Sequence, residues 1–265
     1  MAGVGLRSTL RKVESMRHLS LGFVALLATV ENLVVFALAV LVGGRVRNRH
    51  LPAIARDCQP AIRVLPLING LAVVSAIAIN SAVTVAGFVL WTHGTIRIDK
   101  AGPRTPIDLL VIVAVTDFSL WLGHTAAHLP GVYNLAHRFH HRTADPVPVS
   151  LFVLHPIESL SFGALWLAFL TVWHTSWPAL VAYAAINLAF GTASHLGVDP
   201  LPASVRRSVL FRWIATPTMH LQHHHDPSVN RGFYTTIWDR IFGTLDPSYD
   251  DCRVGAQPPQ CQASV

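Results

Sequence analysis

Long apolar runs constrain the fold of this chain more than any other feature of its sequence. Hydrophobic residues make up 52% of the 265 residues and charged residues only 13%, and the apolar positions form continuous blocks. A helix needs about 20 apolar residues to cross a bilayer, and all 20 Lys and Arg residues lie outside the blocks, a separation that a soluble helical bundle does not explain. We therefore expect an all-α integral membrane bundle of about four to five transmembrane helices, at about Leu19 to Val42, Val64 to Trp91, Ile107 to Leu122, Ser159 to Trp173 and Trp177 to Ala193.

The fourth and fifth runs are short, so we expect them to form a tight hairpin around residues 176–178. The first run is too long for a cleavable signal peptide and no small-residue cleavage site closes it, so we expect it to remain as an anchor. No nucleic-acid partner is needed to explain the net charge of +6, because basic loops beside anionic lipid account for it.

Basic residues also predict an orientation, because cytoplasmic loops carry the excess of Lys and Arg. With five crossings, thirteen of the 20 lie on the side that holds most histidines and seven on the other. This predicts a cytoplasmic, histidine-rich helical cap. Four basic residues at the N-terminus argue the other way and leave a re-entrant first segment as an alternative: Arg7, Arg11, Lys12 and Arg17.

Histidines form the second constraint, since twelve of the fifteen lie between His124 and His225. Most fall in three clusters, HTAAH, HRFHH and HLQHHH, whose members are three or four residues apart and so share a helix face. Eight imidazoles could then converge on one place, and His195 is the best single addition. Transition metals use several imidazole ligands at once, whereas one tetrahedral ion uses four. The pattern predicts two metal ions.

Five other residues are candidates for a supporting role around the metal ligands. Asp117 lies in the third span and would accept from the free N–H of a ligand, unless it only joins helices. Glu158, in the HPIE segment, fits a helix-capping role as well as a catalytic one, and His155 could support the site from the same segment. Asp239 could hold a histidine or pair with Arg, and His225 fits a helix-terminal or substrate-side position.

Taken together, these motifs resemble the fatty acid hydroxylase and sterol desaturase superfamily of membrane di-iron oxygenases. The resemblance covers roughly residues 117–244 and rests on DFSLWLGHTAAH, HRFHH, HPIE, the isolated His195, TPTMHLQHH and WDRIFGT, in the family's order. It departs from the family at Thr125 and Arg231, where Arg and Tyr are usual. The resemblance implies di-iron ligation by nine histidines: His124, His128, His137, His140, His141, His195, His220, His223 and His224.

The resemblance also implies the chemistry, which is O2-dependent hydroxylation or desaturation of a C–H bond in a lipid, with hydroxylation the commoner outcome. It implies two Fe ions, with zinc as a mis-metallated form, and electrons from a separate cytochrome- or ferredoxin-type donor. We expect transmembrane helices and loops in residues 1–106, the catalytic region in 107–246 and a mobile tail in 247–265. Two alternatives remain, a histidine-rich metal transporter and a zinc-dependent hydrolase, although HTAAH lacks the glutamate of HExxH.

Overall fold

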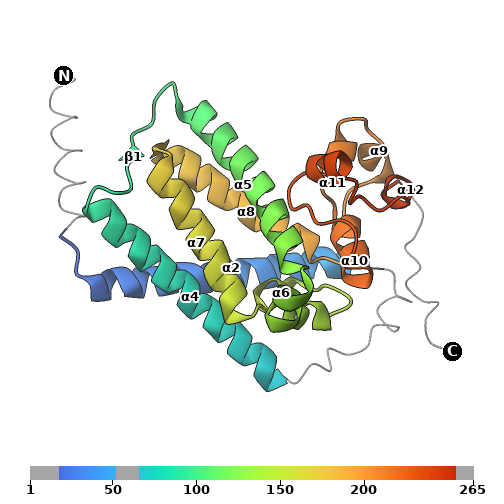
Figure 1. The fold of residues 1–265 in the computed structure, drawn as a ribbon, viewed down its shortest axis with the longest axis horizontal. Coiled ribbons are helices and arrows are strands. Elements are labelled where there is room, and N and C mark those ends of the chain that lie inside the picture. The colour runs from blue at the N-terminus through green and yellow to red at the C-terminus, as the bar shows by residue number, and fades with distance from the viewer. Residues whose placement is uncertain (1–17, 52–65, 255–265) are drawn as a thin grey trace.

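A computed structural model of the chain describes residues 18–51 and 66–254. Five long helices form the body of the molecule (Figure 1). These are α2 (Leu21–His50), α4 (Pro66–Thr92), α5 (Thr105–Ala127), α7 (Pro156–Val172) and α8 (Trp177–Ser194). The all-α membrane architecture expected from the sequence is confirmed, since three of them, α2, α4 and α5, are long and apolar enough to cross a membrane. At 17 and 18 residues, α7 and α8 are shorter than the three long helices.

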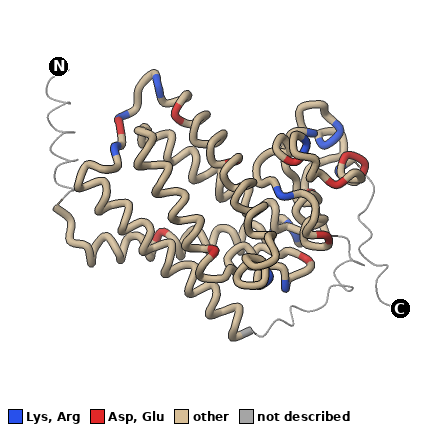
Figure 2. The backbone as a smooth tube through the Cα atoms, in the orientation of Figure 1, with Lys and Arg blue, Asp and Glu red and all other residues tan. Residues whose placement is uncertain are grey.

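Apolar side chains on the long helices face outward. Leu26, Leu33 and Leu41 of α2 and Leu67 and Leu71 of α4 are each about half exposed or more. In water such faces would be costly, whereas a bilayer offers them an apolar solvent. Charged residues gather at the two ends of the bundle and leave the long helices almost bare (Figure 2). Both observations fit an integral membrane protein.

Small residues let the helices approach closely. A Cβ atom at Gly43 in α2 would lie 2.8 Å from Cγ2 of Thr192 in α8. A Cβ atom at Gly163 in α7 would overlap Val83 of α4. Helices in membranes associate mainly through such close packing, so these two positions hold α2 and α7 against their neighbours.

A polar link ties the ends of the helices opposite the histidine clusters. The strands β1 (Ile98–Asp99) and β2 (Thr175–Ser176) pair in parallel, with Ile98 opposite Thr175. The Asp108 carboxylate accepts from the Ser176 backbone N–H at 3.0 Å and pairs with Arg104 at 3.1 Å. A short connection at β2 joins α7 to α8 and is fixed to the start of α5. The expected tight hairpin is not seen, because α7 packs chiefly against α4 and α8 chiefly against α5.

Short helices cover the other end of the bundle (Figure 1). They are α6 (Pro130–Leu135), η1 (His137–Arg142), η2 (Pro148–Phe152), α9 (Ala203–Arg206), η3 (Phe211–Trp213), α10 (Pro217–His225), α11 (Ile237–Phe242) and α12 (Tyr249–Cys252). Prolines begin several of them, as Pro217 does in α10, because the first helical position needs no N–H partner. Together they form a helical cap at this end of the bundle.

The expectation of a mobile tail from residue 247 is wrong for residues 247–254. Tyr249 is fully buried, and its hydroxyl lies 3.2 Å from the Ile214 carbonyl oxygen and from the Thr216 hydroxyl. Asp250 pairs with Arg240 at 2.8 Å and with Arg253 at 3.0 Å. The polar composition that suggested mobility instead supplies these contacts, whereas residues 255–265 lie outside the described part of the chain.

Candidate metal centre

Four segments carry the nine histidines to the cap end of the bundle. His124 lies in the last turn of α5 and His128 caps it, because Leu129 and Pro130 end the helix. The 3₁₀ helix η1 carries three histidines and α10 carries three more, while His195 directly follows α8. Sequence positions up to 100 residues apart thus meet at one place.

The histidines form two groups, and the clusters seen in the sequence do not correspond to them. The first group joins His124, His128, His137, His141 and His223, and the second joins His140, His195, His220 and His224. Within each group the candidate ligand atoms lie within 4.8 Å of one another. The groups are neighbours, since the rings of His141 and His224 stack at 4.7 Å.

Helix geometry explains why each cluster divides. His220 and His224 are four residues apart on α10 and point to the second group. His223 lies about 100° away around the same helix and points to the first. In η1 the division runs the other way, with His137 and His141 in the first group and His140 in the second. The expectation that the histidines of one cluster share one helix face was therefore wrong for HRFHH and HLQHHH.

In the first group, five Nε2 atoms form a closed ring of short separations. Going around the ring, the Nε2–Nε2 distances between neighbours are 3.0 Å (His124–His137), 3.2 Å (His137–His141), 3.2 Å (His141–His223), 3.1 Å (His223–His128) and 3.3 Å (His128–His124). In the second group, Nε2 of His220 lies 3.3 Å from that of His195 and 3.1 Å from that of His224.

The other ring nitrogen of several of these histidines faces an acceptor that cannot donate. Nδ1 of His124 lies 2.9 Å from the Arg231 carbonyl oxygen, and Nδ1 of His223 lies 2.6 Å from that of Val229. Nδ1 of His224 faces the Thr143 carbonyl oxygen at 2.8 Å. A carbonyl only accepts, so the hydrogen of each neutral ring is assigned to Nδ1. The converging Nε2 atoms therefore present lone pairs to one another.

Burial keeps these rings neutral. Desolvation, with smaller contributions from neighbouring histidines, lowers the pKa of His128 to about 3, of His141 to about 2 and of His195 to about 3. It also lowers the pKa of His223 and His224 well below the usual value. At pH 7 these five imidazoles are unprotonated, which is the form that binds a metal.

These features fit metal ions. Metal–imidazole bonds of about 2.1 Å place neighbouring ligand nitrogens about 3.0–3.4 Å apart, as the Nε2 atoms lie here. Without a cation, the facing lone pairs would repel one another, because rings such as those of His124, His223 and His224 already hold their hydrogen on Nδ1. Imidazole sets suit iron, zinc, copper and nickel. The donor set therefore fits a transition-metal site.

Glu158 is the supporting residue that reaches a candidate ligand directly. Its Oε1 lies 2.7 Å from Nδ1 of His137, and the residue is buried. A carboxylate behind a metal-binding imidazole fixes the ring and makes it a better ligand. The sequence suggested a helix-capping or a catalytic role for Glu158, whereas its hydrogen bond to His137 favours support of the site.

Asp117 does not accept from a histidine, so that expectation is wrong. Its carboxylate accepts from the backbone N–H groups of Tyr234 and Thr235 at 3.0 and 3.2 Å, from the Thr235 hydroxyl at 2.5 Å and from the Trp238 indole at 3.1 Å. It therefore anchors the segment 234–238 to α5. The sequence could not reveal this, because the partners lie more than 115 residues away.

Asp239 supports His124 indirectly, through the backbone of Arg231. Its carboxylate accepts from the backbone N–H groups of Arg231 and Gly232 at 2.8 and 2.7 Å, and the Arg231 carbonyl accepts from His124. The direct bond to a histidine that the sequence suggested is replaced by this relay. Nothing in the sequence indicates that the backbone carbonyl of residue 231 accepts from His124.

The remaining two candidates lie apart from the groups. Nδ1 of His155 accepts from the Ile157 backbone N–H at 3.3 Å, which makes it the N-cap of α7. His225 ends α10 and lies 3.0 Å from Asp145, in agreement with the helix-terminal role. The supporting role considered for His155 is therefore not seen.

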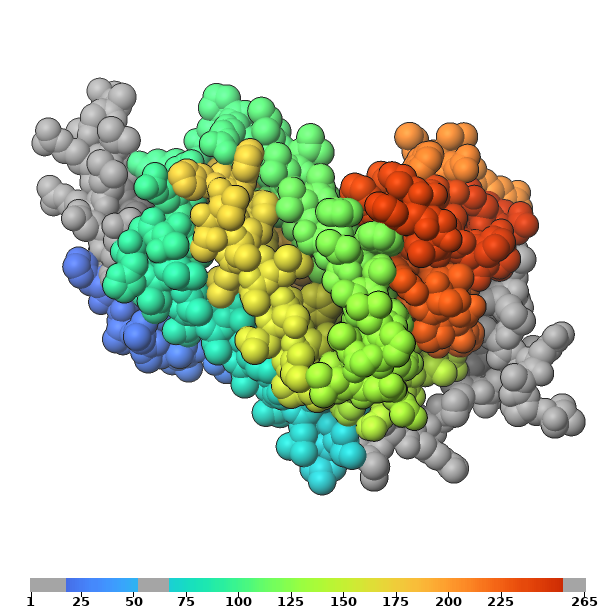
Figure 3. Space-filling view, in the orientation of Figure 1, coloured from blue at the N-terminus to red at the C-terminus, as the bar shows by residue number. Residues whose placement is uncertain are grey.

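A cavity of about 600 Å³ opens from the histidines into the bundle. His124, His137, His140 and His195 form part of its wall, and apolar side chains such as Phe162 form most of the rest. In the space-filling view a hollow lies between α7 and α5, with atoms of α8 at its floor (Figure 3). Its volume is within the range of small-molecule sites, about 300–1,000 Å³.

Comparison with known proteins identifies the family. Residues 109–244 match the family model described as fatty acid hydroxylase, which is more than half of the chain. The chain belongs to the fatty acid hydroxylase family. The matched segment runs from within α5 to the end of α11 and includes all nine histidines.

Several curated proteins are similar in sequence to this chain. A Delta(7)-sterol 5(6)-desaturase of Eremothecium gossypii is 26% identical over 188 residues, which cover 66% of this chain and 50% of that protein. A cholesterol 25-hydroxylase of Rattus norvegicus is 24% identical over 212 residues, covering 77% and 69%. A very-long-chain aldehyde decarbonylase of Oryza sativa subsp. indica is 32% identical over 146 residues, covering 53% and 24%.

This chain spans about half the length of the sterol desaturases that it matches. No solved structure matches it significantly. Family membership and the histidine groups together indicate a metal site in an integral membrane protein.

Proposed function

We propose that this protein is a membrane oxygenase that uses O2 to hydroxylate a C–H bond of a lipid at a site for two iron ions. The nine histidines would hold the ions, five in the first group and four in the second. The observation that carries the proposal is the convergence of Nε2 atoms at 3.0–3.3 Å, among them those of His124 and His223, whose hydrogens are held at Nδ1. Residues 107–246 would form the catalytic region, and residues 1–106 would contribute helices to the cavity wall.

The protein's own residues would position the substrate and exclude water. The cavity lies among helices whose outer faces are apolar, so a lipid can enter from the bilayer without crossing water. Phe233 packs against the His124 ring at 5.2 Å and narrows the cavity beside the first group. Bound iron would supply activation of O2 and removal of hydrogen from the lipid.

Hydroxylation and desaturation begin with the same removal of hydrogen, and substrate position decides between them. We propose hydroxylation, as the commoner reaction that the family resemblance implies. One relative is named a desaturase and another a hydroxylase, so the family contains both. Electrons would come from a separate cytochrome- or ferredoxin-type protein that docks on the cap.

We further propose that the cap faces the cytoplasm. All eight described Arg residues after residue 130 lie in the cap helices or in their connections, outside the long helices, and Arg45, Arg47 and Arg49 end α2 on the same side. Reporter fusions after Arg142 and after Thr244 should both give cytoplasmic signals. An external signal from either fusion would contradict this orientation.

The two alternative functions fit the site less well. A transporter needs ligands along a path through the bilayer, whereas both histidine groups lie at one end of the bundle. A zinc hydrolase needs an open metal position with a general base beside it. Glu158 hydrogen-bonds to His137, one of the candidate metal ligands, and so is not free to act as that base.

Incubation with labelled oxygen tests the chemistry. Membranes containing the protein, supplied with iron, a reducing system and total lipid extract, should form a lipid product that carries one oxygen atom from labelled O2. A matched sample with His224→Ala should form none. Turnover without O2, or label that comes only from water, would contradict the oxygenase proposal and favour a hydrolase. Zinc in the purified protein alone would not decide, because expression hosts can insert it in place of iron.

A further inference from the structure

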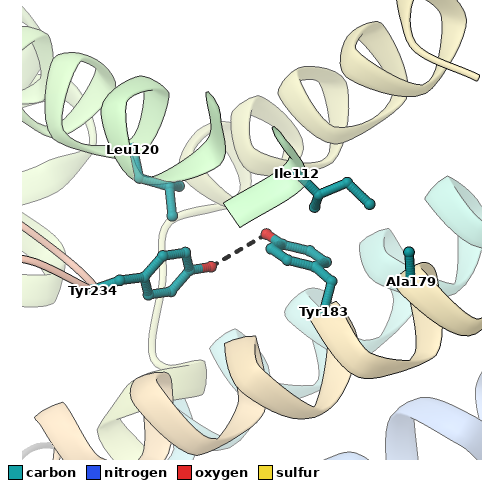
Figure 4. Close-up of a cluster of buried hydrophobic side chains, with 5 residues drawn as sticks. All are labelled: Ile112, Leu120, Ala179, Tyr183 and Tyr234. Carbon is teal, nitrogen blue, oxygen red and sulfur yellow. Dashed lines mark hydrogen bonds between the residues drawn. The ribbon is translucent and has the colours of Figure 1, made fainter. Parts of the chain in front are cut away.

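A chain of three hydrogen-bonded polar side chains lies in the wall of the cavity. The hydroxyl of Tyr234 lies 2.6 Å from Oδ1 of Asn187 and 3.2 Å from the hydroxyl of Tyr183. Figure 4 shows the two tyrosine hydroxyls pointing toward each other across the space between α5 and α8. All three residues line the cavity.

The direction of these hydrogen bonds leaves a free donor. Tyr234 has one hydroxyl hydrogen, which it donates to the Asn187 carbonyl, so Tyr183 donates to Tyr234. The Asn187 amide nitrogen then has two N–H groups, and no hydrogen bond from them is found among the described residues. Since Asn187 is exposed and borders the cavity, these N–H groups are available to a bound molecule.

The charge of the cavity wall limits what that molecule can be. None of the described residues that line the cavity is Lys or Arg, whereas two of them, Glu31 and Glu158, are acidic. A buried anion with no cation beside it is costly. A carboxylate, phosphate or sulfate group at Asn187 would therefore be destabilised, whereas an uncharged hydroxyl or carbonyl group would not.

The distance to the histidines defines how such a lipid would lie. Asn187 precedes His195 by eight residues in α8, which corresponds to about 12 Å along the helix axis. A polar group bound at Asn187 therefore leaves the apolar body of the same molecule to reach the histidines. The bond that reacts would be remote from that polar group.

We propose, on the basis of the proposed lipid-oxidising function, that Asn187, Tyr234 and Tyr183 form a recognition site for the neutral hydroxyl or carbonyl group of an otherwise apolar lipid. The site selects uncharged lipids and excludes anionic ones. It orients the substrate with its polar group at the middle of α8 and its body toward the metal centre. These residues position the substrate and take no part in the chemical step.

Binding measurements test the site independently of turnover. The purified full-length protein in detergent is titrated with two sets of probes: cholesterol, cholestane and cholesterol sulfate, and hexadecanol, hexadecane and palmitate. In at least one set, the alcohol should bind about tenfold more tightly than the hydrocarbon, which is the upper end of the net contribution of one hydrogen bond, and more tightly than the anion.

Two variants and one control locate the effect. Asn187→Leu should abolish the preference for the alcohol and leave hydrocarbon binding unchanged. Tyr183→Phe, which keeps the ring stacked on Trp166, should reduce the preference. Tyr249→Phe removes a buried hydroxyl outside the cavity and should leave it unchanged. Thermal unfolding and metal content of each variant check that the fold is intact.

Several results would overturn the proposal. These are equal binding of alcohol and hydrocarbon by the wild type, no binding in either set, tighter binding of the anion, or a preference that survives in folded Asn187→Leu and Tyr183→Phe. Different results would refute the oxygenase proposal and the recognition site. An alcohol preference without any O2-dependent product would refute the oxygenase and leave the recognition site standing, whereas product without preference would refute the site alone.

Discussion

Replacing Glu158 by glutamine should weaken metal binding about tenfold without unfolding the protein. Glu158 is buried, and its Oε1 accepts from Nδ1 of His137 at 2.7 Å. Glutamine has nearly the same shape and can still offer an oxygen at that position. The substitution therefore removes the charge of the acceptor and little else.

The expected magnitude comes from the difference between two kinds of hydrogen bond. A bond to a charged group contributes about 1.5–3 kcal/mol and a neutral one about 0.5–1.5 kcal/mol. A loss of about 1.4 kcal/mol corresponds to a tenfold change in affinity. This agrees with the 10- to 100-fold losses, on the order of one to two decades, that follow changes behind metal-binding histidines in other proteins.

The assay is iron binding by the purified protein in competition with a chelator of known affinity. Glu31→Gln is the matched control, because Glu31 lines the same cavity from α2 and is not among the hydrogen-bond partners found for the histidines. Glu31→Gln should bind iron like the wild type. Equal affinity of Glu158→Gln and the wild type, or equal losses in both variants, would refute the idea that the carboxylate strengthens His137 as a ligand.

Three further predictions concern the same region. His224→Ala should remove metal and activity, whereas the neighbouring His225→Ala, which loses only a surface contact to Asp145, should retain both; metal analysis of the two proteins compares them, and the opposite order would contradict the grouping. Asp117→Ala should lower the free energy of unfolding by about 3 kcal/mol or more, because it strands several buried donors; denaturant unfolding measures this, and a loss below about 1 kcal/mol would contradict the anchoring role. The metal-free protein should have a lower thermal midpoint at pH 5 than at pH 7. Burial lowers the pKa of His141 to about 2, so below about pH 6.5 the unfolded chain binds protons that the folded chain does not, and stability falls as pH falls. An unchanged midpoint would show that these rings are not buried in the neutral form.

The sequence contains enough information to predict which histidines gather, but not how they divide. Spacing of three and four residues identifies a shared helix face, and it correctly separates His225 from its neighbours. The division of HRFHH between two groups depends on the 3₁₀ geometry of η1 and on where α10 docks. Neither follows from local spacing, because both depend on contacts between segments far apart in the chain.

The acidic residues show the same limit. Glu158 lies in the first turn of α7, but the histidine that it contacts, His137, lies 21 residues earlier in η1, so local spacing does not reveal the contact. The partners of Asp117 and Asp239 lie in the segment 231–238, which folds back onto α5. A carboxylate in an apolar span must have partners, but only the fold decides whether they are histidines or backbone N–H groups.

The distribution of ligands over the chain has a consequence for the order of assembly. Both groups contain residues of η1 and of α10. A nascent chain that has been made only through His195 already holds six of the nine histidines, yet neither group is complete until α10 has docked. Metal uptake therefore belongs to the last stage of folding, and each bound ion would act as a crosslink that closes loops of many tens of residues. Metal occupancy of this protein would report that its assembly in the membrane is finished.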